Sequence, residues 1–407
     1  MAALTSGSNG RGQLQAERIL RCAWLPNAAC SLARLSTLAA MSHVLLSFLA
    51  ATVLTLLVVR SASRHGHLSA DGDLTGPQKF HARPVPRVGG IGVFAGFLAG
   101  AGFAMHRYPE SRDLIGGLIV CALPAFLAGL VEDLTKRVSP FRRMLAIALA
   151  AVLGAWLLDA SIRYTSIPGL DWIAASSLGA VLLAVFVVAG VANSINIIDG
   201  FNGLASMCSM IMLAGMAYVA FSVGDIWVAL CALMAVAATL GFFVWNYPMG
   251  LVFLGDGGAY FLGFVLAELS ILLIGRNPSV SPLFPLLLCA YPVVETVFSM
   301  YRRKVIRGRP VGMPDGVHLH SLVYRRLMRW AIGSRDASVL TRRNSLTAPY
   351  LWVVCSLSAI PAVVWWDDTG MLAVWLVIYA VGYVTVYWRI VRFRTPRWLV
   401  FKRGDRP

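Results

Sequence analysis

Long apolar segments alternate with short polar segments from residue 41 to near the end of the chain. Most of the apolar segments are roughly 17 to 25 residues long, the length that a helix needs to cross a bilayer. A spanning helix satisfies its own backbone hydrogen bonds, so the pattern predicts an all-α polytopic membrane protein with about 11 transmembrane helices. The predicted spans lie near residues 42–60, 88–106, 114–131, 144–158, 176–192, 203–221, 226–244, 257–274, 282–300, 348–366 and 371–388.

The composition agrees with a membrane protein. The chain of 407 residues is 58% hydrophobic and 13% charged, which is too apolar for a soluble domain of this length. Its seven cysteines are scattered without a C-x-x-C pair, so we expect buried thiols and neither disulfides nor a zinc site. The net charge of +16 would suit nucleic acid, but basic residues in a membrane protein usually set its orientation and contact lipid headgroups. We therefore expect a lipid bilayer, and no nucleic acid, as partner.

The chain divides into three regions. Residues 1–40 are polar and rich in small residues, and we expect them to form an amino-terminal extension outside the fold. Met41 stands directly before the first span and would make a natural start. Residues 41–392 form the integral membrane domain, and residues 393–407 form a basic tail.

The distribution of lysine and arginine predicts the orientation. If the amino end lies outside, the loops 60–87, 131–143 and 301–347 and the carboxyl-terminal tail are cytoplasmic and carry most of the basic residues. The outward loops then hold only Arg107, Arg112, Arg163 and Arg276. The positive-inside rule therefore places the carboxyl end and all the polar motifs described below in the cytoplasm. A transporter would instead keep its polar residues near the bilayer midplane, on broken helices.

The first cytoplasmic loop combines basic residues with prolines. Pro84 and Pro86 hold this segment extended, and an extended backbone with several cations is suited to clamp phosphate oxygens. The alternative role for any one of these cations is to anchor the chain at the membrane surface. The candidate substrate-binding residues of this loop are Lys79, His81, Arg83 and Arg87.

Two features of the spans look structural. Gly92, Gly96 and Gly100 recur at four-residue spacing inside the second predicted span, which predicts close packing against another helix. Arg142 and Arg143 begin the fourth span, and at least one of them is expected to anchor it among the headgroups.

Acidic residues stand at the ends of two spans. Glu132 and Asp133 follow the third span, and adjacent carboxylates leaving a membrane suggest divalent-cation binding or general-base chemistry. On the catalytic reading, Asp133→Asn would abolish turnover and leave folding intact. Asp256 lies among glycines that let backbone N–H groups approach a ligand, so we interpret it as a Mg²⁺ ligand. A glycine-rich turn with one carboxylate is common, however, and is a weak signal alone.

The segment 190–205 places polar side chains between two long apolar runs. Its amides can read a uracil and a sugar edge, and its carboxylate can face a cation or a ribose. The alternative is a polar loop that only joins two membrane helices. The candidate residues here are Asn193, Asn196, Asp199 and Asn202.

The longest cytoplasmic loop, 301–347, carries histidines and a helical pattern. Apolar residues from Leu319 onward recur at helical spacing with Arg325 on the other side, which predicts an amphipathic helix lying on the membrane surface. His318 and His320 can donate to a diphosphate or a sugar, and their spacing does not favour zinc. Glu295 lies inside a predicted span and is a functional candidate, unless it only pairs with a neighbouring arginine.

Together these motifs resemble those of the polyprenyl-phosphate N-acetylhexosamine-1-phosphate transferase superfamily of bacterial inner membranes, the glycosyltransferase family 4 type. The matching motifs are K-x-H-x-R-P-x-P-R-x-G-G, the acidic pair, N-x-x-N-x-x-D-G-x-x-G-L-A, Gly-Asp-Gly-Gly and D-x-x-H-x-H, in the expected order over residues 42–390. The resemblance implies an enzyme that uses Mg²⁺ to join a UDP-sugar to a lipid phosphate, and Mn²⁺ is the alternative ion.

The resemblance also implies roles for matching positions. Asp256 and Asp133 would hold the metal, with Asp133 and Glu132 also serving as the acidic pair. Asn193, Asn196 and Asp199 would meet the nucleotide, and Asn202 would belong to the same binding motif. The remaining matching residues are His318 and His320 as catalytic residues, and Lys79, His81, Arg83 and Arg87 as substrate-binding residues. Arg325 lies outside the matching motifs and is a further candidate for substrate binding.

Three departures from the family pattern refine the prediction. Glu132 stands where aspartate is usual, and Asn202 stands where a second aspartate is common and cannot act as a base. The late loop lacks the three consecutive histidines typical of the phospho-MurNAc-pentapeptide transferases. The resemblance therefore favours the undecaprenyl-phosphate GlcNAc-1-phosphate transferase branch.

The predicted activity is transfer of a sugar-1-phosphate, with N-acetylhexosamine-1-phosphate favoured, from a UDP-sugar to undecaprenyl phosphate with release of UMP. This would be the first step of an O-antigen-type cell-surface polysaccharide, at a cytoplasmic active site in the bacterial inner membrane. The alternatives are a phospho-MurNAc-pentapeptide transferase of peptidoglycan synthesis, a lipid-phosphate transporter, and a catalytically lapsed paralogue that binds lipid phosphate. A homodimer is left open.

Overall fold

The computed structural model describes residues 41–69, 85–308, 310, 315–328, 336–394 and 400. Over these ranges the chain folds into helices and turns without a β-strand, so the predicted all-α class is confirmed. The long helices are α3 (Ser42–Ser69), α4 (Gly90–Arg107), α5 (Arg112–Thr135), α6 (Pro140–Leu157), α8 (Ser177–Ile198), α9 (Leu204–Ser222), α10 (Ile226–Asn246), α11 (Gly255–Arg276), α15 (Ala337–Val364) and α16 (Thr369–Val391).

Nine helices of the described part of the chain are long and apolar enough to cross a membrane. α4 is not among these nine; it is a continuous helix of 18 residues that contains several glycines and ends in His106 and Arg107. The nine also exclude the ninth predicted span, which is divided into α12 (Leu283–Leu288) and α13 (Ala290–Tyr301). All eleven predicted apolar segments are thus helical, while their number of membrane crossings stays a prediction.

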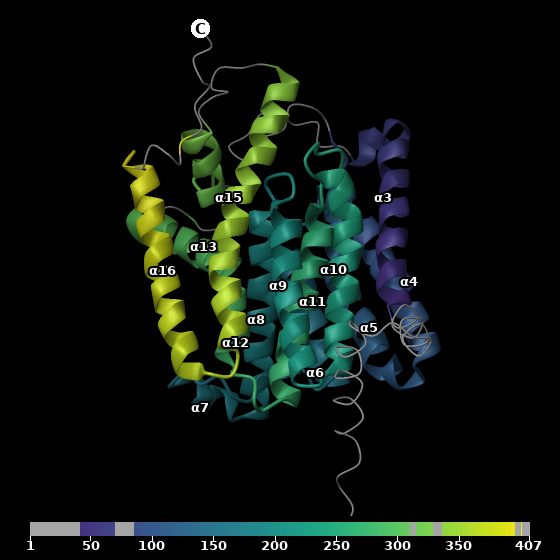
Figure 1. Ribbon diagram of the computed structural model, residues 1–407, viewed down its shortest axis with the longest axis vertical. Helices are drawn as coiled ribbons and strands as arrows, with labels where there is room; N and C mark the ends of the chain where they lie inside the picture. Colours follow the sequence, from purple (N-terminus) through teal and green to yellow (C-terminus); the bar gives the residue numbers. More distant parts are fainter. Residues whose placement is uncertain are drawn as a thin grey trace, which may run out of the picture.

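The break between α12 and α13 has a local cause. Pro292 has no backbone N–H, so it cannot donate the hydrogen bond that would join the two helices. In Figure 1, α13 runs at an angle to its neighbours instead of continuing along the bundle. A π-helical turn, η3 (Arg302–Ile306), directly follows α13. This bend brings the late polar loop back toward the bundle.

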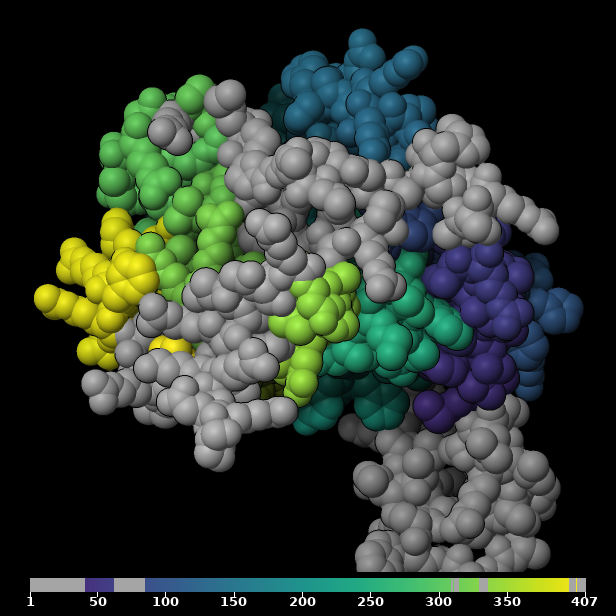
Figure 2. Space-filling model, turned by 90° about the horizontal axis from the view of Figure 1, so that it is seen from above, coloured from purple at the N-terminus to yellow at the C-terminus, as the bar shows by residue number. Residues whose placement is uncertain are grey.

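Helix α11 is the centre of the molecule. Every residue from Gly255 to Leu273 is buried, and the helix packs against α5, α8 and α4, among others. Figure 1 shows α8 to α11 in the middle of the bundle, with α3 and α4 on one side and α15 and α16 on the other. Viewed from above, the purple α3 and the yellow α16 lie at opposite edges (Figure 2). The first turn of α11 is therefore surrounded by the ends of other helices.

The glycines of α4 pack closely against α3, as predicted. A Cβ at Gly92 would lie 2.1 Å from Thr55 Oγ1, and one at Gly100 would lie 1.9 Å from Ser47 Oγ. At Gly96 it would lie 2.5 Å from the Ala51 Cβ. A side chain at any of these positions would push the two helices apart.

The outer surface of the bundle is apolar. Trp156, Phe186 and Leu178 are 78%, 76% and 71% exposed, and many other large hydrophobic side chains on the long helices are exposed too. Water would not favour such a surface, whereas bilayer hydrocarbon would. The structure thus supports a multi-pass membrane protein.

The predicted amphipathic helix of the late loop needs correction. It forms α14 (Leu319–Leu322) and a π-helical turn, η4 (Val323–Leu327). Its apolar side chains are buried, and both segments pack against α15. Arg325 is exposed, as the pattern predicted. The apolar face therefore covers the protein interior and does not lie on the membrane surface.

Candidate functional site

The carboxylate of Asp133 holds the first turn of α11. Its Oδ1 accepts the backbone N–H of Asp256 at 2.9 Å, and its Oδ2 accepts that of Gly257 at 2.9 Å. The first N–H groups of a helix have no partner within the helix, so an acceptor at this point stabilises them. The end of α5 and the start of α11 are thereby fixed together.

This approach requires a glycine at the start of α11. Gly255 has a φ of +75°, and a Cβ there would lie 1.9 Å from the carbonyl oxygen of Arg87. It would also lie 2.6 Å from Asp133 Oδ2. Glycine alone combines this backbone conformation with the missing side chain.

Asp256 gathers polar side chains from three other parts of the chain. The Asn196 amide on α8 donates to Oδ1 at 2.9 Å, and Arg87, just before α4, lies 3.5 Å from the same oxygen. Arg143, near the start of α6, pairs with Oδ2. Asp256 is buried, so these donors compensate the cost of removing its charge from water.

Asp199 follows α8 and joins the same cluster. Burial raises the pKa of its carboxyl to about 7, and the charge of Asp256 acts in the same direction. Arg87 and the backbone N–H of Gly255 oppose that rise. The helix ends thus bring together three carboxylates, Asp133, Asp199 and Asp256, with two guanidinium groups.

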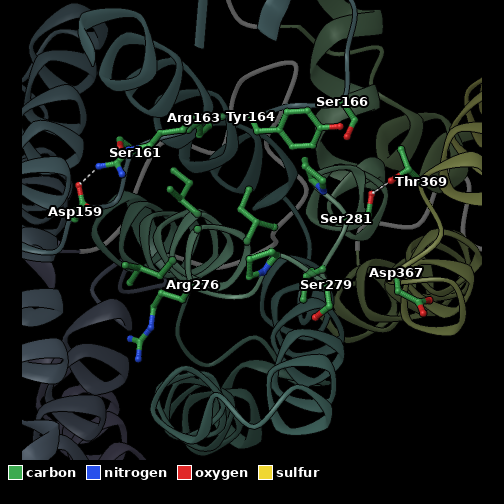
Figure 3. A pocket seen from close by; sticks show the side chains of 18 of the residues that line it. Asp159, Ser161, Arg163, Tyr164, Ser166, Arg276, Ser279, Ser281, Asp367 and Thr369 are labelled. Carbon is green, nitrogen blue, oxygen red and sulfur yellow. Dashed lines mark hydrogen bonds and ion pairs between the residues drawn. The ribbon is translucent and has the colours of Figure 1, made fainter. Parts of the chain in front are cut away.

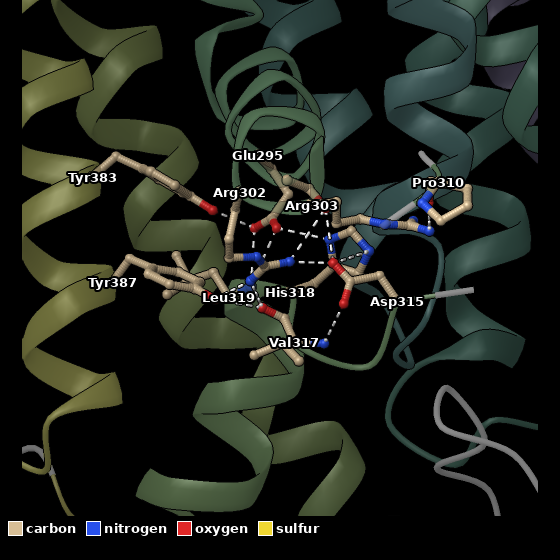
Figure 4. Close-up of polar contacts among 11 residues, drawn as sticks. Glu295, Arg302, Arg303, Pro310, Asp315, Val317, His318, Leu319, Tyr383 and Tyr387 are labelled. Carbon is tan, nitrogen blue, oxygen red and sulfur yellow. Dashed lines mark hydrogen bonds and ion pairs between the residues drawn. The ribbon is translucent and has the colours of Figure 1, made fainter. Parts of the chain in front are cut away.

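A second polar cluster centres on Glu295 of α13 (Figure 4). Its carboxylate lies 2.9 Å from Nδ1 of His318 and accepts the backbone N–H of Leu319 at 3.1 Å. The hydroxyl of Tyr383 on α16 donates to Oε2 of Glu295 at 2.6 Å, whereas His318 contacts Oε1. This carboxylate therefore fixes both the His318 ring and the start of α14.

Arg302, the first residue of η3, supports the same loop. It pairs with Asp315 and donates to the Val317 carbonyl oxygen and the Tyr387 hydroxyl. Burial alone would raise the pKa of Asp315, but Arg302 and, more weakly, His318 hold it below its usual value. Glu295 thus contacts the histidine motif, and Arg302, the neighbouring arginine considered as its partner, pairs with Asp315. A functional role for Glu295 stays a prediction.

His320 connects the two clusters. Its ring centroid lies 5.4 Å from that of Phe201, and Nε2 would lie 3.6 Å from a Cβ at Gly200. Its ring stacks on that of His318 with centroids 5.1 Å apart. Burial and the neighbouring His318 lower the pKa of His320 to about 3, so the imidazole is neutral at physiological pH. Gly200 directly follows Asp199, so the two clusters adjoin.

The other predicted site residues are placed as follows. Lys79, His81 and Arg83 lie outside the described residues. Asn193 lies one helical turn before Asn196 on α8 and is half-buried. Arg325 of η4 is exposed, whereas His318 and His320 are buried. For these residues a substrate-binding role stays a prediction.

Glu132 and Asn202 make contacts that support the fold. Glu132 Oε2 accepts the backbone N–H of Val138 at 2.7 Å and so stabilises the turn between α5 and α6. The Asn202 amide donates to the Pro248 carbonyl oxygen at 3.1 Å and to Ser345 Oγ at 3.2 Å. Neither side chain shows a direct bond to Asp256 in these contacts.

Sequence reasoning missed Arg143 and Tyr383. Arg143 appeared only as one of two adjacent arginines, and the sequence does not show which of them faces Asp256. Arg142 is exposed and Arg143 is half-buried, because successive residues of a helix point in different directions. Tyr383 is one of several tyrosines spaced four residues apart on α16, with Tyr379 and Tyr387, a pattern that could have indicated an inward-facing stripe.

The residue types of the first cluster fit a magnesium ion. Over the described ranges, no three His, Cys, Asp or Glu side chains are grouped so as to hold a metal by themselves. Mg²⁺, however, commonly uses one or two carboxylates and takes its remaining ligands from water and substrate phosphates. Asp133 and Asp256 meet that requirement, since both are buried carboxylates and the carboxylate of Asp133 accepts the backbone N–H of Asp256.

A cavity of about 570 Å³ lies at the other end of α11 (Figure 3). Arg276, Arg163 and Asp367 are among its lining residues. α11 has 22 residues and therefore spans about 33 Å, at 1.5 Å per residue. This cavity is thus separated from Asp256 by about the thickness of a membrane and is not part of the polar clusters.

The fold and the clusters define a class, a helical membrane protein with buried acidic and basic groups gathered at one end of its bundle. Known proteins narrow that class. Residues 115–274, which include α5 to α11 almost entirely, match the model of glycosyl transferase family 4. This segment is thus similar to a glycosyl transferase family 4 domain, which supports the superfamily predicted from the motifs, and the relatives below support the predicted branch.

The curated relatives are similar along most of their length. The chain is 28% identical over 351 residues to the probable undecaprenyl-phosphate N-acetylglucosaminyl 1-phosphate transferase of Bacillus subtilis (strain 168), covering 85% of this chain and 89% of that protein. It is 28% identical over 383 residues to the undecaprenyl-phosphate alpha-N-acetylglucosaminyl 1-phosphate transferase of Salmonella typhi, covering 91% and 98%. A putative UDP-N-acetylglucosamine–dolichyl-phosphate N-acetylglucosaminephosphotransferase of Saccharolobus solfataricus is 28% identical over 236 residues, covering 58% and 71%.

Proposed function

We propose that this protein transfers a sugar-1-phosphate, favouring N-acetylhexosamine-1-phosphate, from a UDP-sugar to undecaprenyl phosphate. The names of the relatives support this substrate pair. The observation that carries the proposal is the meeting of Asp133, Asp199 and Asp256 with Arg87 and Arg143 at the start of α11. Such a mixture of carboxylates and guanidiniums suits a reaction between two anionic phosphates.

The reaction is a phosphoryl transfer. A phosphate oxygen of the lipid forms a bond to the β-phosphorus of the UDP-sugar, and the bond from that phosphorus to the oxygen bridging it to the α-phosphate breaks. UMP leaves with the electron pair of that bond. Arg87 and Arg143 are suited to contact the phosphate oxygens, because a guanidinium can donate two parallel hydrogen bonds to one phosphate. Asn196 and Asn193 are proposed to meet the nucleotide.

Magnesium dependence is part of the proposal. Asp256 and Asp133 would hold Mg²⁺, with Mn²⁺ as a substitute, and the ion would supply positive charge to the transferring phosphates. Arg143 pairs with Asp256 in this structure, and this guanidinium would then be released to contact substrate.

Three carboxylates remain candidates for accepting a proton from the lipid phosphate. All three accept backbone N–H groups, Asp133 from Asp256 and Gly257, Glu132 from Val138, and Asp199 from Gly255. Asp199, with its pKa raised to about 7 by burial, is suited to exchange a proton near neutral pH. Asp199 is therefore proposed for this role beside Asp133 and Glu132. His318 and His320 are proposed to donate hydrogen bonds to the diphosphate or the sugar.

The location completes the proposal. The active site faces the cytoplasm of a bacterial inner membrane, and the product begins an O-antigen-type surface polysaccharide. The basic residues of the inward loops support this orientation.

The test is release of UMP by detergent-purified protein given undecaprenyl phosphate, Mg²⁺ and a panel of UDP-sugars that includes UDP-MurNAc-pentapeptide. We expect UMP with UDP-GlcNAc or UDP-GalNAc, loss of release with EDTA, and recovery on adding excess Mg²⁺. Asp256→Asn serves as the inactive control. Release with UDP-MurNAc-pentapeptide alone would move the protein to the peptidoglycan branch, and no release by folded protein with any donor would refute the transferase.

A further inference from the structure

Three consecutive polar residues near the start of α15 are buried in the protein interior. They are Arg343, Asn344 and Ser345. α15 is long and apolar enough to cross the membrane, and buried polar groups in such a helix cost free energy unless they form hydrogen bonds. The three residues also lie outside the segment 115–274 that matches the family model. Their bonding partners indicate why this turn of α15 is polar.

Asn344 and Ser345 bond to the segment 199–203, which joins α8 to α9. The backbone N–H of Asn202 donates to Oδ1 of Asn344 at 2.9 Å. The amide nitrogen of Asn202 donates to Oγ of Ser345 at 3.2 Å. The Ser345 hydroxyl in turn donates to the carbonyl oxygen of Pro248, in the loop after α10. The start of α15 thus ties the segment between α8 and α9 to the loop after α10.

Arg343 bonds to the histidine segment, residues 318–327, which contains both histidines, α14 and η4. Its Nη2 donates to the carbonyl oxygen of Tyr324 at 2.8 Å, and its guanidinium carbon lies 4.1 Å from the centre of the Tyr324 ring. A buried guanidinium over an aromatic face is stabilised by a cation–π interaction of about 2 kcal/mol. One turn of α15 therefore contacts both the segment 199–203 and the histidine segment.

Phe201 joins these two segments to each other. Its ring centroid lies 5.5 Å from that of Tyr324 and 5.4 Å from that of His320. In the sequence, Phe201 stands between Asp199, one of the proposed proton acceptors, and Asn202, which α15 holds. A displacement of this segment would therefore move the Asp199 carboxylate relative to the His320 ring. A misplacement of about 1 Å at an active site can lower a rate about 10²-fold.

The amide nitrogen of Asn202 is fully engaged by these contacts. An asparagine amide nitrogen has two hydrogens to donate. One is donated to Oγ of Ser345, and the other to the carbonyl oxygen of Pro248 at 3.1 Å. Aspartate, which is common at this position in the family pattern, has no such donor. The asparagine at position 202 thus matches the polar residues of α15.

We propose that Arg343, Asn344 and Ser345 are positioning residues, which hold the segment 199–203 against the histidine segment during transfer. The proposal rests on the proposed transferase function and adds residues of α15 to its site. In this role they act through Asn202 and Tyr324 and do not contact the reacting phosphates. Their loss is therefore expected to lower turnover more than the binding of either substrate.

The test removes single contacts of this turn and compares them with a buried hydroxyl of the same helix. Ser345→Ala and Asn344→Ala remove bonds to the segment 199–203, and Arg343→Met removes those to the histidine segment while keeping a long side chain. Thr347→Val is the matched control, because Thr347 is buried and its Oγ1 donates to the carbonyl oxygen of Arg343 within α15. UMP release gives kcat and KM, and calorimetry with the UDP-sugar counts the binding sites per chain.

We expect the three positioning variants to lower kcat by about 10- to 100-fold, because they displace catalytic groups. The number of binding sites per chain and the KM for undecaprenyl phosphate should change little, and Thr347→Val should behave like the wild type. A kcat that falls only in proportion to the number of binding sites, or an equal loss in Thr347→Val, would show a merely structural role and overturn the proposal. An unchanged kcat in the folded positioning variants would overturn it as well.

A second measurement does not depend on turnover. Hydrogen–deuterium exchange, read by mass spectrometry, reports the local opening of backbone N–H groups. Loss of one hydrogen bond should speed exchange about 2- to 10-fold, within 199–203 for Ser345→Ala and Asn344→Ala and within the histidine segment for Arg343→Met. Faster exchange in these segments supports the positioning contacts even if no UMP is released, and exchange equal to the wild type in all three variants would overturn the proposal. Failure of the transferase and failure of the positioning role are thus separate results.

Discussion

At the scale of single residues, Asp133 contributes both to the fold and to the proposed chemistry. Both of its carboxylate oxygens accept backbone N–H groups of α11. An asparagine at this position would offer only one accepting oxygen, because its amide nitrogen donates. One buried N–H would therefore lose its acceptor, at a cost of about 1–3 kcal/mol. The sequence alone had suggested that this exchange would leave folding intact.

We predict that Asp133→Asn abolishes UMP release and also lowers the thermal stability of the purified protein. Asp199→Asn should lower release by about 10²- to 10⁴-fold, the usual contribution of a proton-transferring group, with a smaller effect on stability. Thermal unfolding in detergent and the UMP assay, run on the same samples, measure both effects. An Asp133→Asn protein as stable as the wild type would contradict the structural role of this carboxylate.

Glu295 is predicted to act through His318. Glu295→Gln replaces one accepting oxygen by a donating amide and removes the charge beside the His318 ring. Hydrogen bonds to charged groups contribute about 1.5–3 kcal/mol, so we expect release of UMP to fall by about 10- to 100-fold. Steady-state kinetics of the purified variant measures the change.

Tyr383→Phe provides the comparison, because it removes one hydrogen bond to Glu295 and keeps the carboxylate. We expect a smaller loss for this variant. Equal losses for the two variants would indicate that the Tyr383 contact, and not the carboxylate facing His318, is what matters.

The limits of sequence reasoning at this scale follow from particular residues. The nearness of Asp133 and Asp256 was predictable, since both end apolar segments on the same predicted face. The group that Asp133 bonds was not predictable, because the sequence does not indicate which backbone N–H groups lie beside a given side chain. Nor could the sequence assign Arg143 to Asp256, since Arg142 beside it has the same charge and length.

At the scale of helices, the apolar segments predicted the elements well. Ten of the eleven predicted spans correspond to one helix each, and most ends are shifted by a few residues. The larger shifts are at α3, which continues from the predicted end at 60 to Ser69, and at α15, which starts at Ala337 instead of 348. The division of the ninth at Cys289 was missed, although Pro292 was a signal for it. The packing of the late loop was also mispredicted. An amphipathic pattern shows that one face of a helix is buried, but it does not show whether that face packs against a membrane or against the protein interior.

The contact between α4 and α11 yields a prediction at this scale. A Cβ at Gly90 would lie 2.3 Å from the backbone nitrogen of Gly258, and backbone cannot yield as a flexible side chain does. Gly90→Ala should therefore separate the two helices, reduce stability by about 1–3 kcal/mol and shift Asp256 enough to weaken UMP release. Thermal unfolding and the UMP assay again provide the measurements.

Gly102→Ala is the matched control for this helix. A Cβ there would meet nothing within 4 Å, and alanine favours helix over glycine, so stability should be unchanged or slightly higher. If Gly90→Ala behaved like Gly102→Ala, the close approach of α4 and α11 would not be required for activity.

At the scale of the whole molecule, the arrangement of charges predicts one orientation in the membrane. Glu132 and Asp133 lie at the end of α5, and α6 carries the chain from that end to the segment that holds Arg163. With 18 residues, α6 spans about 27 Å, so Arg137 before it and Arg163 after it lie on opposite sides of the bundle. Both arginines are exposed, which makes them a matched pair for labelling.

We predict that, in intact cells, a membrane-impermeant maleimide labels Arg163→Cys and does not label Arg137→Cys until the membrane is permeabilised. The described cysteines Cys121, Cys208, Cys231, Cys289 and Cys355 are buried and should react little. Cys22 and Cys30, outside the described residues, are replaced by serine in both variants. If Arg137→Cys alone were labelled in intact cells, the protein would have the opposite orientation in the membrane. That orientation would place the carboxylate cluster on the outer side, where a UDP-sugar made in the cytoplasm could not reach it, and so would contradict the proposed donor as well as the topology.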